Sequence, residues 1–198
     1  VEQFAQGQHA ATSFAHGNDD LVRLVAPRRI DEIHAAGQNP VAGHLMGGVG
    51  LLRREKAEKP DGMAQIRHGV LDRNRLSMIL AVLSRHGGIS LGSADVFVNV
   101  VGGVRVDEPG ADLAIALAVA SAQSGQPLVG SGGRPRACFG ELGLTGDLRY
   151  VGHPDRRTAE AAKFGLAPVI GPPVAESLRG LSPSPTLRKA LKSAFSAP

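Results

Sequence analysis

Histidine and cysteine, the side chains that most often bind metals or assist nucleophilic catalysis, form no recognisable site in this sequence. Five of the seven histidines lie toward the N-terminal end at irregular spacings that match no compact metal-binding pattern, namely His9, His16, His34, His44 and His68. The single cysteine, Cys138, lies in an apolar run, which excludes an intrachain disulfide and a cysteine-rich zinc site. A free buried thiol is typical of a reducing compartment, so we expect a cytoplasmic protein.

A glycine-rich run from Gly47 to Gly50 is a second candidate, because loops of glycine backbone can cradle phosphate groups. No Gly-Lys-Ser or Gly-Lys-Thr follows it, and no strand-turn-helix pattern surrounds it. We therefore expect an apolar structural segment here and not a nucleotide site.

Charge is the third candidate. The formal net charge is +4; residues 1–70 hold 8 Lys+Arg and 8 Asp+Glu, so residues 71–198 hold 22 − 8 = 14 against 18 − 8 = 10. The excess permits an acidic partner such as nucleic acid, although a small excess is also ordinary for solubility. No apolar run is long enough for a membrane span and the start lacks a signal-peptide pattern, so no membrane partner is expected.

The elements that must position these side chains become clear from residue 71 onward. Asp72 can cap a helix from Arg73 to about Arg85, and Gly87 or Gly88 can end it. Spacings of three and four residues give this helix one apolar face, made by Leu76, Ile79, Leu80 and Leu83.

Strands and further helices alternate after this point. A buried strand at 95–101 precedes a helix at about 111–124 that is apolar all round and should be buried on most sides. A hairpin at 137–151, a helix at 156–164 and a short strand at 167–170 follow. This alternation predicts an α/β or α+β fold with one sheet.

The two ends of the chain are less regular. Residues 1–69 offer only a short strand or helical turn at 21–26 and a brief helix at 28–36, and the first residue is Val, which fits an alternative start codon or an upstream truncation. Residues 176–198 contain a Pro-rich link and a helix at 186–195 carrying Arg188, Lys189 and Lys192. This helix is either a solvated surface helix or a DNA-contact helix. We expect the domain itself to cover residues 70–175.

Four blocks of this domain resemble, in order, the C-terminal domain of the bacterial RadA (Sms) DNA repair family, whose fold is that of the Lon protease proteolytic domain. The blocks are Asp95 to Asn99 with Gly102-Gly103, Glu108 to Ala114, Gly140 to Arg149, and Arg156-Arg157 with Glu160 to Gly165. The resemblance implies an α/β (α+β) domain of the ribosomal protein S5 domain 2-like, Lon proteolytic-domain-like fold, preceded by a poorly defined N-terminal segment.

The resemblance also bears on catalysis. In the Lon protease family a serine opens the apolar helix, and a lysine at the start of the helix after the hairpin activates it as general base. The matching motifs place the serine position at Ala111 and the lysine position at Arg157. Alanine has no nucleophile, and arginine stays protonated at any working pH. We therefore expect no catalytic residue in this domain.

In the resembling family the Lon-like domains form a hexameric ring, contribute to DNA binding and support an ATP-driven motor in branch migration. The resemblance thus implies a non-proteolytic scaffold that oligomerises and contacts single-stranded or branched DNA, with the recombinase of the same pathway as a further partner. The candidate DNA contacts are Arg105, Arg149, Arg156, Arg157 and Lys163. For each of them the alternative is a surface salt bridge with Glu108, Asp112, Asp147 or Glu160.

Cofactors are implied only for the full-length family, which uses ATP, Mg and Zn. This chain holds no Walker A loop, no four-cysteine zinc finger and no Lys-Asn-Arg-Phe-Gly motif, so we expect no cofactor in it. Two alternatives to the scaffold remain: a Lon-type Ser/Lys peptidase, which the absent dyad disfavours, and an inert fragment of a disrupted gene, in which residues 1–69 are divergent or frame-shifted.

Overall fold

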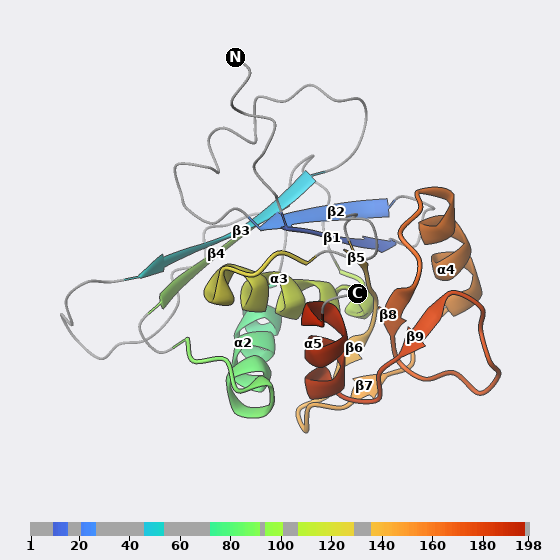
Figure 1. The fold of residues 1–198 in the computed structure, drawn as a ribbon. Coiled ribbons are helices and arrows are strands. Elements are labelled where there is room, and N and C mark those ends of the chain that lie inside the picture. The colour runs from blue at the N-terminus through green and yellow to red at the C-terminus, as the bar shows by residue number, and fades with distance from the viewer. Residues whose placement is uncertain are drawn as a thin grey trace, which may run out of the picture.

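The computed structural model describes residues 10–15, 21–26, 46–53, 72–91, 94–100, 107–128 and 136–196. These ranges contain both helices and strands, as the alternating sequence pattern predicts (Figure 1). The helix expected at 28–36, the five N-terminal histidines, Gly102-Gly103 and Arg105 lie outside the described residues.

A five-stranded mixed sheet forms one layer of the fold. Its strands are β1 (Ala10–Ala15), β2 (Leu21–Ala26), β3 (Met46–Arg53), β4 (Ala94–Val100) and β5 (Arg136–Ala137), in the order β4-β3-β2-β1-β5. The β1–β2 and β3–β4 pairs are antiparallel, and the β2–β3 and β1–β5 pairs are parallel. Three strands thus come from a segment for which the sequence predicted little regular structure.

The glycine-rich run of the sequence lies inside β3. Gly47, Gly48 and Gly50 are paired with β4 in an antiparallel register. Because these glycines form part of a strand, they do not make a phosphate-binding loop, as expected from the missing Lys-Ser/Thr. The segment at 21–26, for which strand and helical turn were both open, is a strand.

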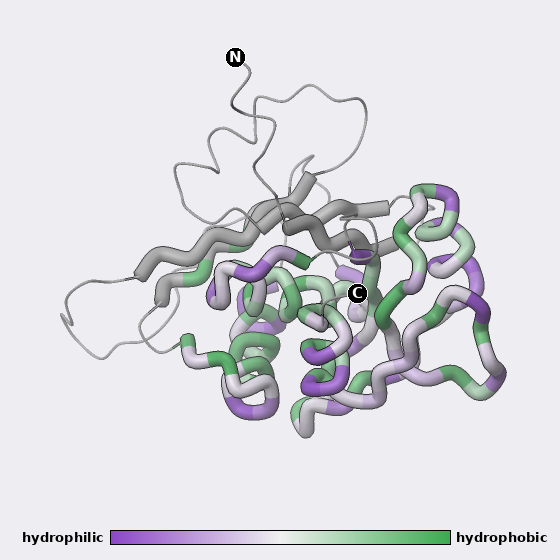
Figure 2. Tube along the Cα trace, viewed as in Figure 1, coloured by the Kyte–Doolittle hydropathy of each residue, from purple (hydrophilic) through white to green (hydrophobic). Residues whose placement is uncertain are grey.

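Helix α3 (Asp112–Ser124) is the central element of the core. A 3-10 turn, η2 (Pro109–Ala111), leads into it, and the ten residues from Asp112 to Ser121 are all buried. On one side α3 contacts β1, β2 and β3, and on the other it contacts α2 (Arg73–Gly87) and α5 (Leu187–Phe195), so it lies between two layers (Figure 1). A helix in that position has no solvent-facing side, which explains why its sequence has no polar stripe (Figure 2).

Helix α2 begins and ends as the sequence predicts. The Asp72 carboxylate accepts a hydrogen bond from the Arg75 backbone N–H at 2.8 Å, and Gly88 ends the helix with φ of 71°. The buried side chains of α2 are Leu76, Ile79, Val82 and Leu83. The predicted apolar face is therefore confirmed, with Leu80 half-buried at its margin.

Helix α5 packs against α2 and α3. Its buried side chains repeat every three or four residues and are Leu187, Ala190, Leu191 and Ala194. Gly87 permits the close approach, because a Cβ atom there would lie 3.1 Å from Leu191 Cδ1. The helix expected at 186–195 is therefore confirmed, and one face of it belongs to the core, not to solvent.

The segment that joins α4 (Pro154–Lys163) to α5 is also more regular than its prolines suggested. Residues of the expected Pro-rich link form β9 (Leu181–Pro183), which pairs in parallel with β8 (Val169–Gly171). Proline lacks the N–H of a central strand, but it is compatible with the end of an edge strand. This part of the chain is thus attached to the domain through backbone hydrogen bonds.

The predicted hairpin is present in a shorter form. Strands β6 (Glu141–Leu142) and β7 (Leu148–Arg149) are antiparallel, and the Gly143 N–H donates to the Asp147 carbonyl at 2.9 Å. The residues before β6 pair elsewhere, since Ala137 lies beside β1 and Cys138 bridges Ile170. Expecting one hairpin from 137 to 151 was therefore wrong for the residues before β6 and right for the part around the turn.

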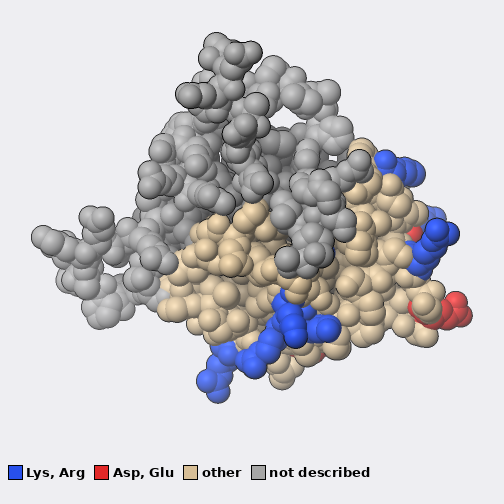
Figure 3. All heavy atoms as spheres, viewed as in Figure 1, with Lys and Arg blue, Asp and Glu red and all other residues tan. Residues whose placement is uncertain are grey.

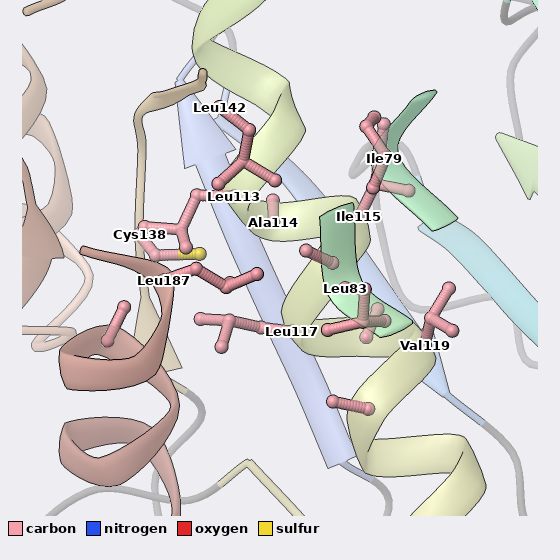
Figure 4. Close-up of a cluster of buried hydrophobic side chains, with 14 of the residues drawn as sticks. Ile79, Leu83, Leu113, Ala114, Ile115, Leu117, Val119, Cys138, Leu142 and Leu187 are labelled. Atoms are coloured by element: carbon pink, nitrogen blue, oxygen red, sulfur yellow. The ribbon is translucent and has the colours of Figure 1, made fainter. Parts of the chain in front are cut away.

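The main hydrophobic cluster joins α2, α3 and α5 (Figure 4). Cys138 lies within it, fully buried, and burial raises the pKa of its thiol well above the ordinary value. The thiol is therefore a small apolar group in the folded domain. Among the helices that the structure describes, none is long and apolar enough to cross a membrane.

Candidate functional site

The structure brings the two positions of the missing dyad together. Ala111 is buried at the entry to α3, and Arg157 lies in the first turns of α4. A Cβ atom on Gly110, the neighbour of Ala111, would lie 3.5 Å from Arg157 Nη1. The two segments that the family motifs matched are therefore adjacent in space.

Arg157 holds several elements together at this junction. Its Nε–H donates to the Gly152 carbonyl at 2.9 Å, and its Nη2 donates to Glu108 Oε1 at 3.2 Å. The guanidinium also lies over the Phe139 ring, 5.7 Å from the ring centroid. Because the side chain is only 8% exposed and pairs with Glu108, it is poorly accessible to a phosphate.

The chemistry available at these two positions is limited. Ala111 offers no nucleophilic atom, and an arginine cannot accept a proton as a general base. Within the described ranges, no group of three or more His, Cys, Asp and Glu side chains could hold a metal ion. Arg157 therefore joins protein segments at this junction, and these two side chains offer neither a nucleophile nor a general base.

A second buried charge lies one residue beyond Ala111. The Asp112 carboxylate is fully buried and accepts hydrogen bonds from Arg75 Nε at 2.6 Å, Arg75 Nη2 at 2.8 Å and the Leu142 backbone N–H at 3.1 Å. Burial raises the pKa of Asp112, while the bonds from Arg75 and Leu142 oppose that rise. The bond to Asp112 in turn raises the pKa of Arg75. This bidentate pair joins α2, α3 and β6.

Three further candidate DNA contacts, Arg149, Arg156 and Lys163, lie on the surface. Arg149 pairs through Nε with Asp147 at 3.2 Å and through Nη1 with Glu141 at 3.6 Å, and Lys163 pairs with Glu160 at 2.7 Å. Arg156 is exposed on α4. Exposed ion pairs of this kind stabilise a fold by only about 0–1 kcal/mol, so they can be exchanged for a phosphate at little cost.

The salt-bridge alternative is thus realised for several candidates. Of the predicted acidic partners, Glu108, Asp147 and Glu160 pair with Arg157, Arg149 and Lys163, respectively. Arg105 lies outside the described residues. An ion pair within the protein does not exclude a contact with DNA. That these five residues contact DNA therefore stays a prediction.

About half of the chain is similar in sequence to known proteins. The DNA repair protein RadA of Haemophilus influenzae is 48% identical over 102 residues, which are 52% of this chain and 21% of that protein, and RadA of Escherichia coli gives the same values. RadA of Streptococcus pneumoniae is 42% identical over 113 residues, 57% of this chain and 25% of that protein. This chain carries a RadA-related region. The matches span about a fifth to a quarter of the length of these curated relatives, and no family model matches the sequence.

The relationship confirms the RadA resemblance predicted from the four blocks. Within these blocks, sequence reasoning missed the partner of Asp112, because Arg75 lies 37 residues away on the preceding helix. One signal could have found it. A carboxylate that opens an otherwise apolar, fully buried helix needs a cation or several donors nearby, because burying an unpaired charge is very unfavourable.

Proposed function

We propose that the RadA-related region is a non-proteolytic, Lon-like scaffold domain of a RadA-type DNA repair protein, which mediates oligomerisation and contacts DNA. The curated relatives are named for DNA repair, which supports the repair role. The observation that carries the scaffold role is the state of the dyad positions. Ala111 is buried, and Arg157 is committed to Gly152 and Glu108, so the region that would perform proteolysis holds structural contacts.

Charge supports contact with DNA. Arg149, Arg156 and Lys163 are exposed, and the ion pairs of Arg149 and Lys163 are weak enough to be replaced by phosphate oxygens. A hexameric ring, as the resemblance implies, would bring together six copies of the formal charge of +4, or 6 × 4 = +24. Several subunits binding one strand would turn weak individual contacts into strong binding.

Under the same proposal, the other functions of the family belong to parts of the full-length proteins outside this region. Branch migration, ATP hydrolysis, and the Mg and Zn sites would belong to the remaining parts of full-length RadA-type proteins, and the pathway's recombinase would act on the assembly. The region described here would then bind DNA without any cofactor.

Binding of a labelled oligonucleotide, measured by fluorescence anisotropy at 50 and 200 mM salt, tests the proposal. Three phosphate contacts predict a slope of log K against log salt of about −2 for single strands, and therefore roughly 20-fold weaker binding at the higher salt. Single-stranded and branched oligonucleotides of equal length should both bind. Absence of saturable binding to either at 50 mM salt would refute DNA contact by this chain.

A further inference from the structure

Two neighbouring helices carry more unopposed positive charge than any of the predicted contact sites. Arg85 of α2 and three residues of α5, Arg188, Lys189 and Lys192, are all exposed. We call these four residues the α2–α5 basic face. Neither helix contains an aspartate or a glutamate anywhere in its sequence. Lys and Arg side chains gather over this part of the molecule in Figure 3, apart from a second group over α4.

The fold keeps these four residues on one surface. The apolar side of α5 is buried against the core, so its basic residues must face solvent. The C-terminal end of α2 meets the first turns of α5, because a Cβ atom on Gly87 would lie 3.1 Å from Leu191 Cδ1 and 3.6 Å from Leu187 Cδ2. The hairpin turn fixes this junction further, since the Leu187 N–H donates to the Gly146 carbonyl at 2.8 Å. The C-terminal end of α2, which carries Arg85, therefore lies near the start of α5.

Comparison with α4 shows how unusual this charge is. The exposed and half-buried charges of α4 are Asp155, Arg156, Glu160 and Lys163, which sum to 2 − 2 = 0. The α2–α5 basic face sums to +4. The nearest acidic group on the hairpin is Asp147, which is bonded to Thr145 and to Arg149. Long-range attraction of a polyanion should therefore be stronger at α5 than at α4.

We propose that the α2–α5 basic face is the principal surface for the nucleic-acid phosphate backbone in this domain, an inference that rests on the proposed function. The contact is with phosphate and independent of sequence, because stacking of bases needs exposed aromatic rings. The one Phe, Tyr or Trp of these two helices, Phe195, packs against the core. A membrane surface fits less well, since an interfacial helix inserts an apolar face and that of α5 is buried.

Two matched double variants test the assignment. Arg188→Gln/Lys192→Gln removes one arginine and one lysine from α5, and Arg156→Gln/Lys163→Gln removes the same pair of residue types from α4. All four side chains are exposed, so both variants should keep the unfolding midpoint of the wild type. Binding to a duplex and to a single strand is measured for each protein over a range of salt concentrations.

For the α5 variant on duplex DNA, we expect the slope of log K against log salt concentration to be less steep by about two. We also expect this variant to bind roughly 10- to 100-fold more weakly at 50 mM salt. The α4 variant should change less in both its salt slope and its affinity at 50 mM salt. Equal losses in the two variants, or a loss in the α4 variant alone, would overturn the assignment and leave the proposed function standing. No binding by the wild type would instead refute the proposed function. Binding of phosphatidylserine vesicles with the same dependence on α5, and no binding of DNA, would overturn the choice of partner.

Discussion

Replacing Asp112 with alanine is expected to lower the free energy of unfolding by about 3–5 kcal/mol, the range for breaking a buried ion pair by removing one partner. The change leaves the Arg75 guanidinium, which is 26% exposed and donates twice to the carboxylate, without that acceptor. It also leaves the Leu142 N–H unsatisfied. Urea unfolding followed by far-UV circular dichroism would measure the loss.

Two further variants test whether the loss of stability comes from breaking the buried Arg75–Asp112 pair and not from removing a carboxylate as such. Glu160→Ala removes a carboxylate whose partner, Lys163, is 70% exposed, and should cost no more than about 1 kcal/mol. The double variant Arg75→Ala/Asp112→Ala should lose less than the sum of its single variants, because the second truncation removes a group that already lacks its partner. Strict additivity would mean that Arg75 and Asp112 do not stabilise the fold through each other.

Replacing Leu117 with alanine should lower the free energy of unfolding by about 2–5 kcal/mol, because the vacated volume lies where no element can collapse easily. Leu117 is 1% exposed in the middle of α3, between the sheet and the second helical layer (Figure 4). Leu144→Ala is the matched control, since it makes the same chemical change at the hairpin tip, where the side chain is 70% exposed. The control should change stability by less than about 0.5 kcal/mol. Equal losses at the two positions would contradict the layered arrangement around α3.

The elements that the sequence predicted well carry their own local signals. Asp72 and Gly88 mark the ends of α2 through a side-chain cap and a left-handed residue, and α3 is apolar all round because two layers cover it. The helix at 186–195 begins, as the structure shows, at a side-chain cap from Thr186. What local signals could not show is which face of α5 meets the core, because that depends on the distant helix α2.

The features that the sequence did not predict depend on long-range pairing. The strands from residues 10–53 are short or glycine-rich and are aligned by their partners in the sheet, so period-two patterning is weak. Pro183 suggested a link, yet its segment forms β9, which pairs with β8, and both strands lie between α4 and α5 in the chain. The pairing of Arg75 with Asp112 joins two helices whose relative placement no local pattern specifies. The five candidate contacts were chosen from the family blocks and so did not include the basic residues of α5, although the sequence left a DNA-contact helix at 186–195 open.

Chemical modification of lysines tests most directly whether nucleic acid lies on the α2–α5 basic face. The intact chain would be acetylated briefly at 50 mM salt with and without saturating DNA, and the modification of Lys163, Lys189 and Lys192 compared by mass spectrometry. All three lysines are exposed, so each should react readily in the free protein. We predict that DNA protects Lys189 and Lys192 more strongly than Lys163. Unchanged modification of Lys189 and Lys192 in the DNA-bound protein would contradict it.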